Sequence, residues 1–263
     1  MAFRNCIICK NNDSVESYCE QEGQLYVKCN SCGLIYVDDF ASQANMNKAY
    51  TGGGLKSFRR RFFGPIRRMR HISQAKHFTQ RAEDIFKFVK NAYARPVEDI
   101  KYIDIGCNKG FLLEQAVKNA ANVYGVELVK EVITPFKNTY PQFKDNIFHE
   151  RFSNVAAKFD DGFFDVVTAM DVIEHFEDPL SDLKHIYRIL KNDGVFVIQT
   201  PDVDTKEAIE QKCAWGGLKP LEHLHLFGKS NFQKFANDAG FSEVTVHDPV
   251  EYGDGNFMAI LKK

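Results

Sequence analysis

The sequence lacks any apolar run that approaches the ~20 residues of a membrane-spanning helix. The residues at its start also lack the apolar segment of a secretory signal, so we expect a cytoplasmic protein with no membrane partner. Internal repeats and low-complexity segments are absent as well. With 44% hydrophobic and 26% charged residues, the composition excludes the disordered and fibrous classes. A chain of 263 residues is long enough to bury a full hydrophobic core.

Net charge is also small, at -1, but the charges are unevenly distributed. Residues 1–55 sum to -2, residues 56–101 to +9 and residues 102–263 to -8. This asymmetry favours an anionic partner near the middle of the chain. The basic segment contains six clustered arginines interleaved with phenylalanines: Arg59, Arg60, Arg61, Arg67, Arg68 and Arg70. Arginine binds phosphate in a bidentate manner, so a phosphate-bearing acceptor or RNA would fit, and a solvated helix face is the third interpretation.

Cysteines number seven, and four of them form two Cys-x2-Cys pairs near the N-terminus. These four are Cys6, Cys9, Cys29 and Cys32. In a chain without an export signal, such pairs indicate metal ligands rather than disulfides. Four thiolates close a tetrahedral site, which predicts a structural zinc ion rather than a catalytic one. The alternative is four buried free cysteines, but a module of this size has too little core to fold without a metal.

Three parts differ in pattern along the chain. Residues 1–40 are predicted to form a zinc-ribbon-like module, and residues 41–99 an Arg-rich helical connector or lid. From residue 100 to residue 263, short apolar runs alternate with helical patterns. This alternation predicts a doubly wound, Rossmann-like α/β domain with a parallel sheet covered on both faces.

The individual elements follow from these apolar runs and helical patterns. In the α/β part, strands are expected at 100–105, 122–127, 146–149, 164–170, 194–200, 243–248 and 256–262. Helices are expected at 77–93 and near 110–120, 130–140, 179–191 and 229–239. The N-terminal module shows β-like runs at 25–29 and 33–37.

A glycine-containing turn follows the first of the α/β strands, in the string Asp104-Ile-Gly106-Cys-Asn-Lys-Gly110. Glycines there let a ligand approach the backbone, next to the free N–H groups of a helix N-terminus. Glu127 ends the next strand, about 20 residues further on, where a carboxylate can accept hydrogen bonds from ribose hydroxyls. A dinucleotide and S-adenosylmethionine both fit this pair of features.

The segment FDVVTAMDVIEHFEDPLSDLKHIYRILKNDGVFVIQTPD (164–202) resembles the central part of class I S-adenosylmethionine-dependent methyltransferases. The resemblance extends over most of 100–263. It favours a methyltransferase over the other function that the fold allows, a nicotinamide-dependent oxidoreductase. It implies that S-adenosyl-L-methionine is the cofactor and that the chain is an enzyme rather than a non-catalytic scaffold. The implied cofactor contacts are Asp104, Gly106, Cys107, Gly110, Glu127, Leu128, Phe152, Met170 and Asp171. Asn108 stands where a glycine is usual, and the usual acidic residue is missing beside Phe152.

The whole arrangement, with CGLIYV at 32–37 and EHLHLF at 222–227, resembles a narrower subgroup of these enzymes. Those proteins are associated with surface-polysaccharide and nucleotide-sugar modification. The resemblance implies methyl transfer, favoured at oxygen, to a small phosphate-bearing acceptor. The alternative is an RNA methyltransferase that grips its substrate with the zinc ribbon and the arginines. The net charge of -2 over residues 1–55 argues against this alternative, because RNA-gripping modules are usually basic.

Histidines mark the candidate catalytic positions. His175 follows the fourth strand, at the end where parallel sheets bind ligands, and is the first candidate for a general base. Glu174 would orient its imidazole or simply start a helix. His223 and His225 alternate, so in an extended segment both would face one side, toward the acceptor. Structural roles are the alternative for all three histidines, and two histidines alone are too few ligands for a metal site.

Overall fold

The computed structural model describes residues 3–38, 66–119, 121–220, 222–249 and 255–263, with side chains from residue 77 onward in the first helix. The strands of its central sheet are β4 (Lys101–Ile105), β5 (Asn122–Val126), β6 (Ile147–Phe148), β7 (Phe164–Met170), β8 (Leu190–Pro201), β10 (Glu243–His247) and β11 (Asn256–Lys262). They are ordered β10-β11-β8-β7-β4-β5-β6. Strands β6, β5, β4, β7 and β8 run parallel to one another, whereas β11 is antiparallel to both β8 and β10. The fold is therefore a Rossmann-like α/β fold with an antiparallel edge.

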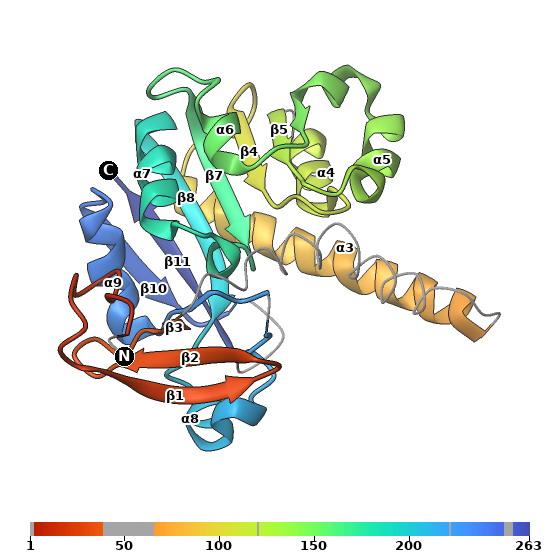
Figure 1. Ribbon diagram of the computed structural model, residues 1–263. Helices are drawn as coiled ribbons and strands as arrows, with labels where there is room; N and C mark the ends of the chain where they lie inside the picture. Colours follow the sequence, from red (N-terminus) through yellow and green to blue (C-terminus); the bar gives the residue numbers. More distant parts are fainter. Residues whose placement is uncertain (1–2, 39–65, 120, 221, 250–254) are drawn as a thin grey trace.

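Helices cover both faces of this sheet (Figure 1). The helices are α3 (Ile66–Tyr93), α4 (Phe111–Lys118), α5 (Lys130–Thr139), α6 (Phe152–Ala156), α7 (Pro179–Ile189), α8 (Lys206–Gln211) and α9 (Lys229–Asp238), with short turns η3 (Pro141–Asn146), η4 (Ile173–His175) and η5 (Lys212–Ala214). Apolar side chains of α3, α4 and α5 pack into one core. Those of α6, α7 and α9 pack into another. Because helices bury β7 on both faces of the sheet, its sequence FDVVTAM is mostly apolar rather than alternating.

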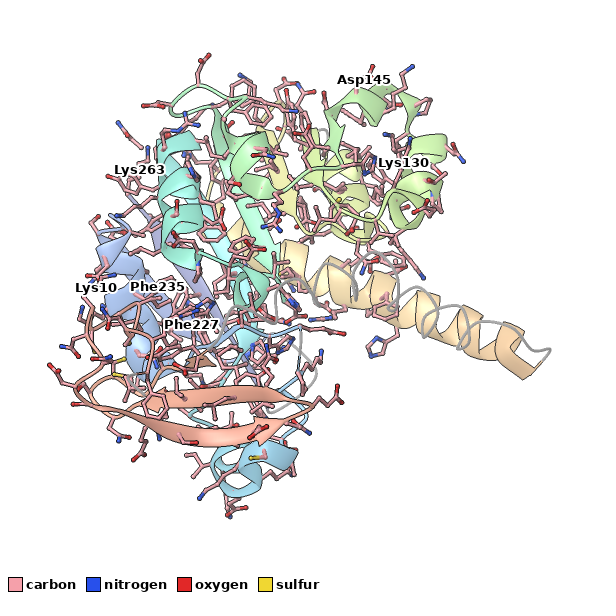
Figure 2. The ribbon with its side chains drawn as sticks, viewed as in Figure 1. Lys10, Lys130, Asp145, Phe227, Phe235 and Lys263 are labelled. Atoms are coloured by element: carbon pink, nitrogen blue, oxygen red, sulfur yellow. The ribbon has the colours of Figure 1, made fainter. Side chains whose placement is uncertain are left out.

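A second sheet joins the N-terminal residues to the C-terminal half of the chain. Its strands are β1 (Val15–Gln21), β2 (Gln24–Cys29), β3 (Ile35–Val37) and β9 (His225–Leu226), in the order β1-β2-β3-β9. Ile35 of β3 pairs with Leu226 of β9, so the N-terminal strands and the C-terminal half of the chain form one sheet. Beside this sheet, the ring of Phe227 packs against that of Phe235 on α9, with ring centroids 4.7 Å apart (Figure 2). The N-terminal residues thus share a hydrophobic core with the central domain.

Most of the expected strands and helices occur within one to four residues of their predicted ends. The helix expected at 179–191 ends at Ile189, because Leu190 already pairs with Phe164 and extends β8 at its start. Strand β1 was not predicted. Residues 39–65, which include Arg59, Arg60 and Arg61, lie outside the described residues. The boundaries proposed at residues 40 and 99 stay predictions.

Among the described residues, no helix is both long and apolar enough to cross a membrane.

Candidate active site

The carboxyl ends of β4, β5, β7 and β8 meet at one edge of the central sheet, where ligands bind in open α/β folds. The predicted glycine turn follows β4, and Glu127 follows β5. Asp171 and the turn η4 follow β7. The sheet therefore brings the predicted cofactor residues and the predicted catalytic residues Glu174 and His175 to the same edge.

The turn after β4 adopts the backbone conformation that its glycines allow. Gly106 and Gly110 have φ values of +71° and +79°, in the left-handed region. A Cβ atom at Gly106 would lie 2.4 Å from Val172 Cγ2, so a larger residue would collide with the loop after β7. Asn108 also adopts a positive φ, of 46°. Because asparagine tolerates this region, Asn108 replaces the usual glycine without breaking the turn.

Asp104 is buried beneath the turn rather than exposed at its surface. Its Oδ1 accepts a hydrogen bond of 2.7 Å from Thr168 Oγ1, and Tyr102 Oη lies 2.8 Å from the same hydroxyl. Burial raises the pKa of Asp104 to about 7, with a smaller contribution from the charge of Glu127. The carboxyl group thus belongs to a buried hydrogen-bonded group below the predicted cofactor site.

Glu127 is half-buried and lies beside the turn. Its Oε2 accepts a hydrogen bond of 3.0 Å from the Asn108 N–H, and its Oε1 accepts one of 2.8 Å from the Val129 N–H. Both are backbone donors, so the carboxylate is held at the lip of the turn. The adjacent Leu128 is 53% exposed and offers an apolar surface next to this carboxylate.

Two predicted cofactor residues have side chains in the core. Cys107 is buried, and its sulfur lies so close to Gly125 that a Cβ there would be 2.9 Å away. Phe152 is buried against Phe176, with ring centroids 6.2 Å apart. Met170, in contrast, is half-buried at the end of β7.

Asp171 is the most highly connected of the predicted cofactor residues. Its Oδ1 accepts hydrogen bonds from Gln199 Nε2 at 3.0 Å and from Asn256 Nδ2 at 3.2 Å. Its Oδ2 forms a salt bridge of 3.0 Å with Arg81 Nη2 on α3. Its φ of +56° is rare for a residue other than glycine. Aspartate, like asparagine, tolerates this region, and the contacts hold the loop in one position.

Glu174, His175 and His223 converge from two distant segments of the chain. Glu174 Oε1 lies 3.9 Å from Nε2 of His175 and 3.9 Å from Nε2 of His223. The two imidazole rings are perpendicular, with centroids 4.7 Å apart. Burial raises the pKa of Glu174 to about 8 and lowers that of His223 to about 3. The pKa of His175 is also lowered, again mainly by burial.

His225 does not join this group; it is fully buried and contacts other residues. Its Nε2 lies 2.8 Å from Arg4 Nη2, and its Nδ1 lies 3.1 Å from the Phe176 carbonyl oxygen. Strand β9 contains residues 225 and 226, and its pairing with β3 continues where the Val37 N–H donates a hydrogen bond of 3.0 Å to the Leu224 carbonyl oxygen. His223 and His225 are thus close along the chain, but their Nδ1 atoms contact different carbonyl oxygens, those of Gly217 and Phe176.

Two contributors to the site were not predicted. Arg81 reaches Asp171 from α3, and Thr200 Oγ1 donates a hydrogen bond of 2.9 Å to Glu174 Oε2. Thr200 belongs to the TPD string at the end of β8, so its place at the ligand-binding edge was available as a signal. Arg81 carries no such signal in an amphipathic helix.

The four predicted zinc ligands form one cluster. The sulfurs of Cys6 and Cys32 are 3.5 Å apart, and those of Cys9 and Cys29 are 3.7 Å apart. Four thiolates at about 2.3 Å from a zinc ion would have sulfurs about 3.8 Å apart, close to these distances. Gly33 follows the last cysteine with a φ of +80°, as a tight metal-binding knuckle requires.

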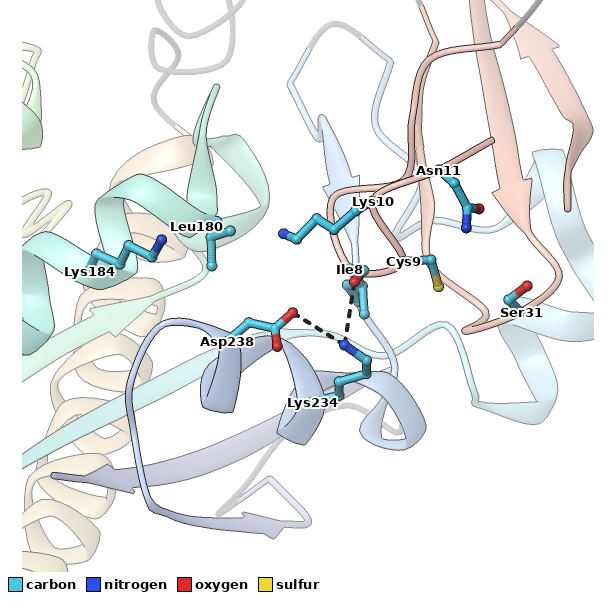
Figure 3. A pocket seen from close by; sticks show the side chains of 9 residues that line it. All are labelled: Ile8, Cys9, Lys10, Asn11, Ser31, Leu180, Lys184, Lys234 and Asp238. Atoms are coloured by element: carbon cyan, nitrogen blue, oxygen red, sulfur yellow. Dashed lines mark hydrogen bonds and ion pairs between the residues drawn. The ribbon is translucent and has the colours of Figure 1, made fainter. Parts of the chain in front are cut away.

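A separate pocket lies where this cysteine cluster faces α7 and α9 (Figure 3). Its walls carry Lys10, Lys184 and Lys234. Lys234 Nζ bonds both the Ile8 carbonyl oxygen, at 3.4 Å, and Asp238 Oδ2, at 3.3 Å. These bonds fasten the first knuckle to α9.

Comparison with known proteins relates the described fold to one group of enzymes. A family described as "Methyltransferase domain" matches residues 77–246, which is more than half of the chain. A ubiquinone biosynthesis O-methyltransferase of Pelagibacter ubique (strain HTCC1062) is 31% identical over 140 residues, covering 52% of this chain and 53% of that protein. A tRNA U34 carboxymethyltransferase of Helicobacter pylori (strain J99 / ATCC 700824) is 33% identical over 129 residues, covering 44% of this chain and 46% of that protein. The chain thus spans about half the length of the curated relatives it matches.

Solved structures agree on the fold. Magnesium protoporphyrin IX methyltransferase from Synechocystis PCC 6803, determined with bound SAH, matches with a TM-score of 0.56 and 14% identity. The match covers 84% of this chain and 100% of that one. At this identity, the likeness concerns the arrangement of the sheet and helices.

Proposed function

This chain belongs to the methyltransferase domain family, and from that premise we propose that it transfers a methyl group from S-adenosyl-L-methionine to a hydroxyl of a small, phosphate-bearing acceptor. One observation carries the proposal. The glycine turn with Glu127 and the polar group of Glu174, His175 and His223 lie at the same edge of the sheet. The first suits a nucleoside, and the second suits the ionisation of a hydroxyl next to it.

The residues present fit the cofactor. Glu127 offers a fixed, half-buried carboxylate to the ribose hydroxyls, and the exposed Leu128 offers an apolar surface to the adenine. The turn from Gly106 to Gly110 lets the cofactor lie against the backbone. When bound, S-adenosylmethionine supplies a methyl group on a cationic sulfur. Asp171, fixed by three side chains, positions the loop along which it would lie.

The chain's own contribution to the reaction is positioning and removal of a proton. Holding acceptor and methyl group in line contributes on the order of 7–11 kcal/mol to lowering the barrier. The acceptor oxygen gives up its proton and forms the new C–O bond as the C–S bond breaks. The side chain of His175 is 25% exposed, whereas those of Glu174 and His223 are almost fully buried. His175 is therefore the member of this group that meets the acceptor.

Methylation at oxygen is supported by the relative from Pelagibacter ubique, which is named an O-methyltransferase. A phosphate on the acceptor is supported by the +9 charge of residues 56–101. The nucleotide-sugar or surface-polysaccharide class rests on the sequence resemblance of 32–37 and 222–227.

A labelled-methyl experiment tests this proposal. Purified protein is incubated with methyl-labelled S-adenosylmethionine and a cell extract that is then separated into nucleotide-sugar and RNA pools. Label in the nucleotide-sugar pool supports the proposal if it disappears with Glu127→Ala and with His175→Ala. A His185→Ala variant, changed on α7 away from the site, serves as the matched control.

RNA is the second candidate acceptor, because the relative from Helicobacter pylori is named a tRNA U34 carboxymethyltransferase. In that case the label would enter the RNA pool, and the connector arginines would grip the nucleic acid. Transfer to RNA alone would overturn the small-acceptor proposal.

The cysteine cluster holds a structural zinc ion in this proposal. Sulfur separations of 3.5 and 3.7 Å match a closed tetrahedral site, which leaves no position for a substrate. Cys29 ends β2, so the ion would fasten the N-terminal sheet against α9.

A further inference from the structure

Glu174, His175 and His223 form a compact cluster of potential metal ligands, apart from the four cysteines. One ligand atom from each side chain lies within 4.8 Å of the other two. Glu174 and His175 lie in the turn η4, and His223 comes from the segment that leads into β9. The backbone joins the two segments where the Leu224 N–H donates a hydrogen bond of 2.7 Å to the Glu174 carbonyl oxygen.

Backbone carbonyls fix both imidazoles in one tautomer. His175 Nδ1 lies 2.8 Å from the Glu222 carbonyl oxygen, and His223 Nδ1 lies 2.7 Å from the Gly217 carbonyl oxygen. A carbonyl oxygen only accepts hydrogen bonds, so each Nδ1 carries the proton. In the neutral rings, each Nε2 then holds a lone pair. Histidines that bind metals are usually oriented by such a bond from the second ring nitrogen.

The carboxylate between the two rings is incompletely satisfied. Glu174 is fully buried, and its Oε2 accepts the hydrogen bond from Thr200 Oγ1. Among the residues the structure describes, its Oε1 has no hydrogen-bond partner. The separation of 3.9 Å from each Nε2 is too long for a hydrogen bond. A buried carboxylate oxygen without a donor is costly, and here it faces two nitrogen lone pairs.

The charges around the cluster favour a cation. Asp171, Glu222 and Lys219 lie close enough to influence the ionisation of Glu174 or His175. Arg81 neutralises Asp171 through their salt bridge. Lys219 offsets Glu222 in the same way, so the net negative charge next to the two imidazoles comes from the Glu174 carboxylate once a bound cation has displaced its proton.

We propose that Glu174 Oε1 and the Nε2 atoms of His175 and His223 bind a divalent transition-metal ion. In a tetrahedral site with bonds of about 2.1 Å, neighbouring ligand atoms are about 3.4 Å apart. The observed 3.9 Å from Glu174 Oε1 to each Nε2 needs a contraction of about half an ångström, and the ligand atoms all lie within 4.8 Å of one another before any ion is bound. Two imidazoles and one carboxylate favour ions of the zinc, cobalt or iron type over magnesium or calcium.

Three protein ligands leave a coordination position open, as in catalytic rather than structural metal sites. The role of the ion rests on the proposed function. The acceptor hydroxyl takes the open position, and the ion lowers the pKa of that hydroxyl so that its proton passes to solvent. Direct proton transfer to His175 is then not required. The metal site itself stands on the geometry of the three ligands and is tested separately from methyl transfer.

Cobalt(II) is a suitable probe, because its visible absorption reports the ligand type. One equivalent of zinc per chain is first added to fill the tighter four-thiolate site, unbound zinc is removed, and Co²⁺ is then titrated while absorption and heat are recorded. We expect one Co²⁺ per chain without the sulfur-to-cobalt charge-transfer band. Glu174→Gln and His223→Ala should each weaken this binding by about a hundredfold or more, and the control His185→Ala should leave it unchanged.

Binding of S-adenosylmethionine and thermal unfolding are measured on the same samples, so that a misfolded variant is recognised. His175→Ala, at the most exposed ligand, serves as the replacement if a buried variant does not fold. Absence of Co²⁺ uptake by the wild type, or uptake that Glu174→Gln leaves unchanged, would overturn the proposal. The buried carboxyl would then be satisfied by a proton. Uptake without methyl transfer would preserve the metal site and contradict the proposed function instead.

Discussion

Arg81 Nη2 lies 3.0 Å from Asp171 Oδ2 and joins α3 to the loop that follows β7. The side chain of Arg81 is 26% exposed and that of Asp171 37% exposed, so the pair lies at the edge of the site. Asp171 also accepts hydrogen bonds from Gln199 and Asn256, on the antiparallel pair β8 and β11. The loop predicted to lie along the cofactor is therefore held from two sides, and α3 provides one of them.

Arg81→Ala should weaken S-adenosylmethionine binding severalfold while changing the free energy of unfolding by about 1 kcal/mol or less, as for other partly exposed ion pairs. The reason is that Asp171 keeps two partners but loses its link to α3. Calorimetric titration with the cofactor measures the affinity. Arg95→Ala is the matched control, because Arg95 pairs with Asp193 just beyond the C-terminal end of α3. Equal effects of the two changes would show that Arg81 has no specific role.

Glu127→Ala should weaken S-adenosylmethionine binding by about 10- to 100-fold. Hydrogen bonds to a charged group contribute about 1.5–3 kcal/mol, and each 1.4 kcal/mol corresponds to a tenfold change in affinity. Glu127→Gln should retain part of the affinity, since an amide oxygen still accepts from the Asn108 N–H. Equilibrium binding of the cofactor is the measurement, with Glu131→Ala on the exposed side of α5 as control. Wild-type affinity in Glu127→Ala would refute the ribose contact.

The strands and the site features that depend on local spacing were predictable from the sequence. The turn from Gly106 to Gly110 follows a continuous apolar strand, and the four cysteines follow the Cys-x2-Cys rule. In both cases the predicted site residues are close together along the chain, or lie next to a strand whose apolar pattern is recognisable. The structure accordingly brings the four sulfurs together, while the zinc ion stays a prediction.

Features that depend on contacts between distant segments were not predictable. Arg81 meets Asp171 across 90 residues, and nothing in an amphipathic helix says which polar side chain faces a ligand. His223 and His225 were paired by alternation, but β9 begins only at residue 225, where it joins the N-terminal sheet. In the structure His223 lies beside Glu174, whereas His225 lies beside Arg4 of the N-terminal residues. Periodicity within one segment carries no information about such a partner.

The pH dependence of stability should contain a contribution from Asp104. Its pKa is about 7 in the folded protein, against an ordinary value of 3.8, because burial disfavours the carboxylate. Between these two values the folded state binds a proton that the unfolded state has lost. The contribution therefore stabilises the fold at low pH and is lost as the pH rises to about 7, by at most about 1.4 kcal/mol per pH unit.

Asp104→Asn removes this titration and still offers an oxygen to Thr168 Oγ1. The variant should be more stable than the wild type at pH 8, with a difference that shrinks toward pH 4. Urea unfolding at several pH values measures the effect. Asp145→Asn, at an exposed position in η3, should leave the profile unchanged. A stability difference that grows toward acid pH would show that Asp104 is ionised in the folded state throughout this range.

Removal of the proposed zinc ion should open the N-terminal sheet, and the fluorescence of the single tryptophan should report this opening. Trp215 is 5% exposed and packs in one apolar cluster with Tyr26, Ile35 and Leu226, which lie on three strands of that sheet. Because Cys29 ends β2, loss of the metal frees the same sheet from its anchor. Chelator treatment, or Cys29→Ser, should move the tryptophan emission to longer wavelength and release one tightly held zinc ion per chain. Cys107→Ser, at a cysteine outside the cluster, should retain that ion. Unchanged emission after complete removal of the metal would mean that β3 and β9 hold the sheet together without it.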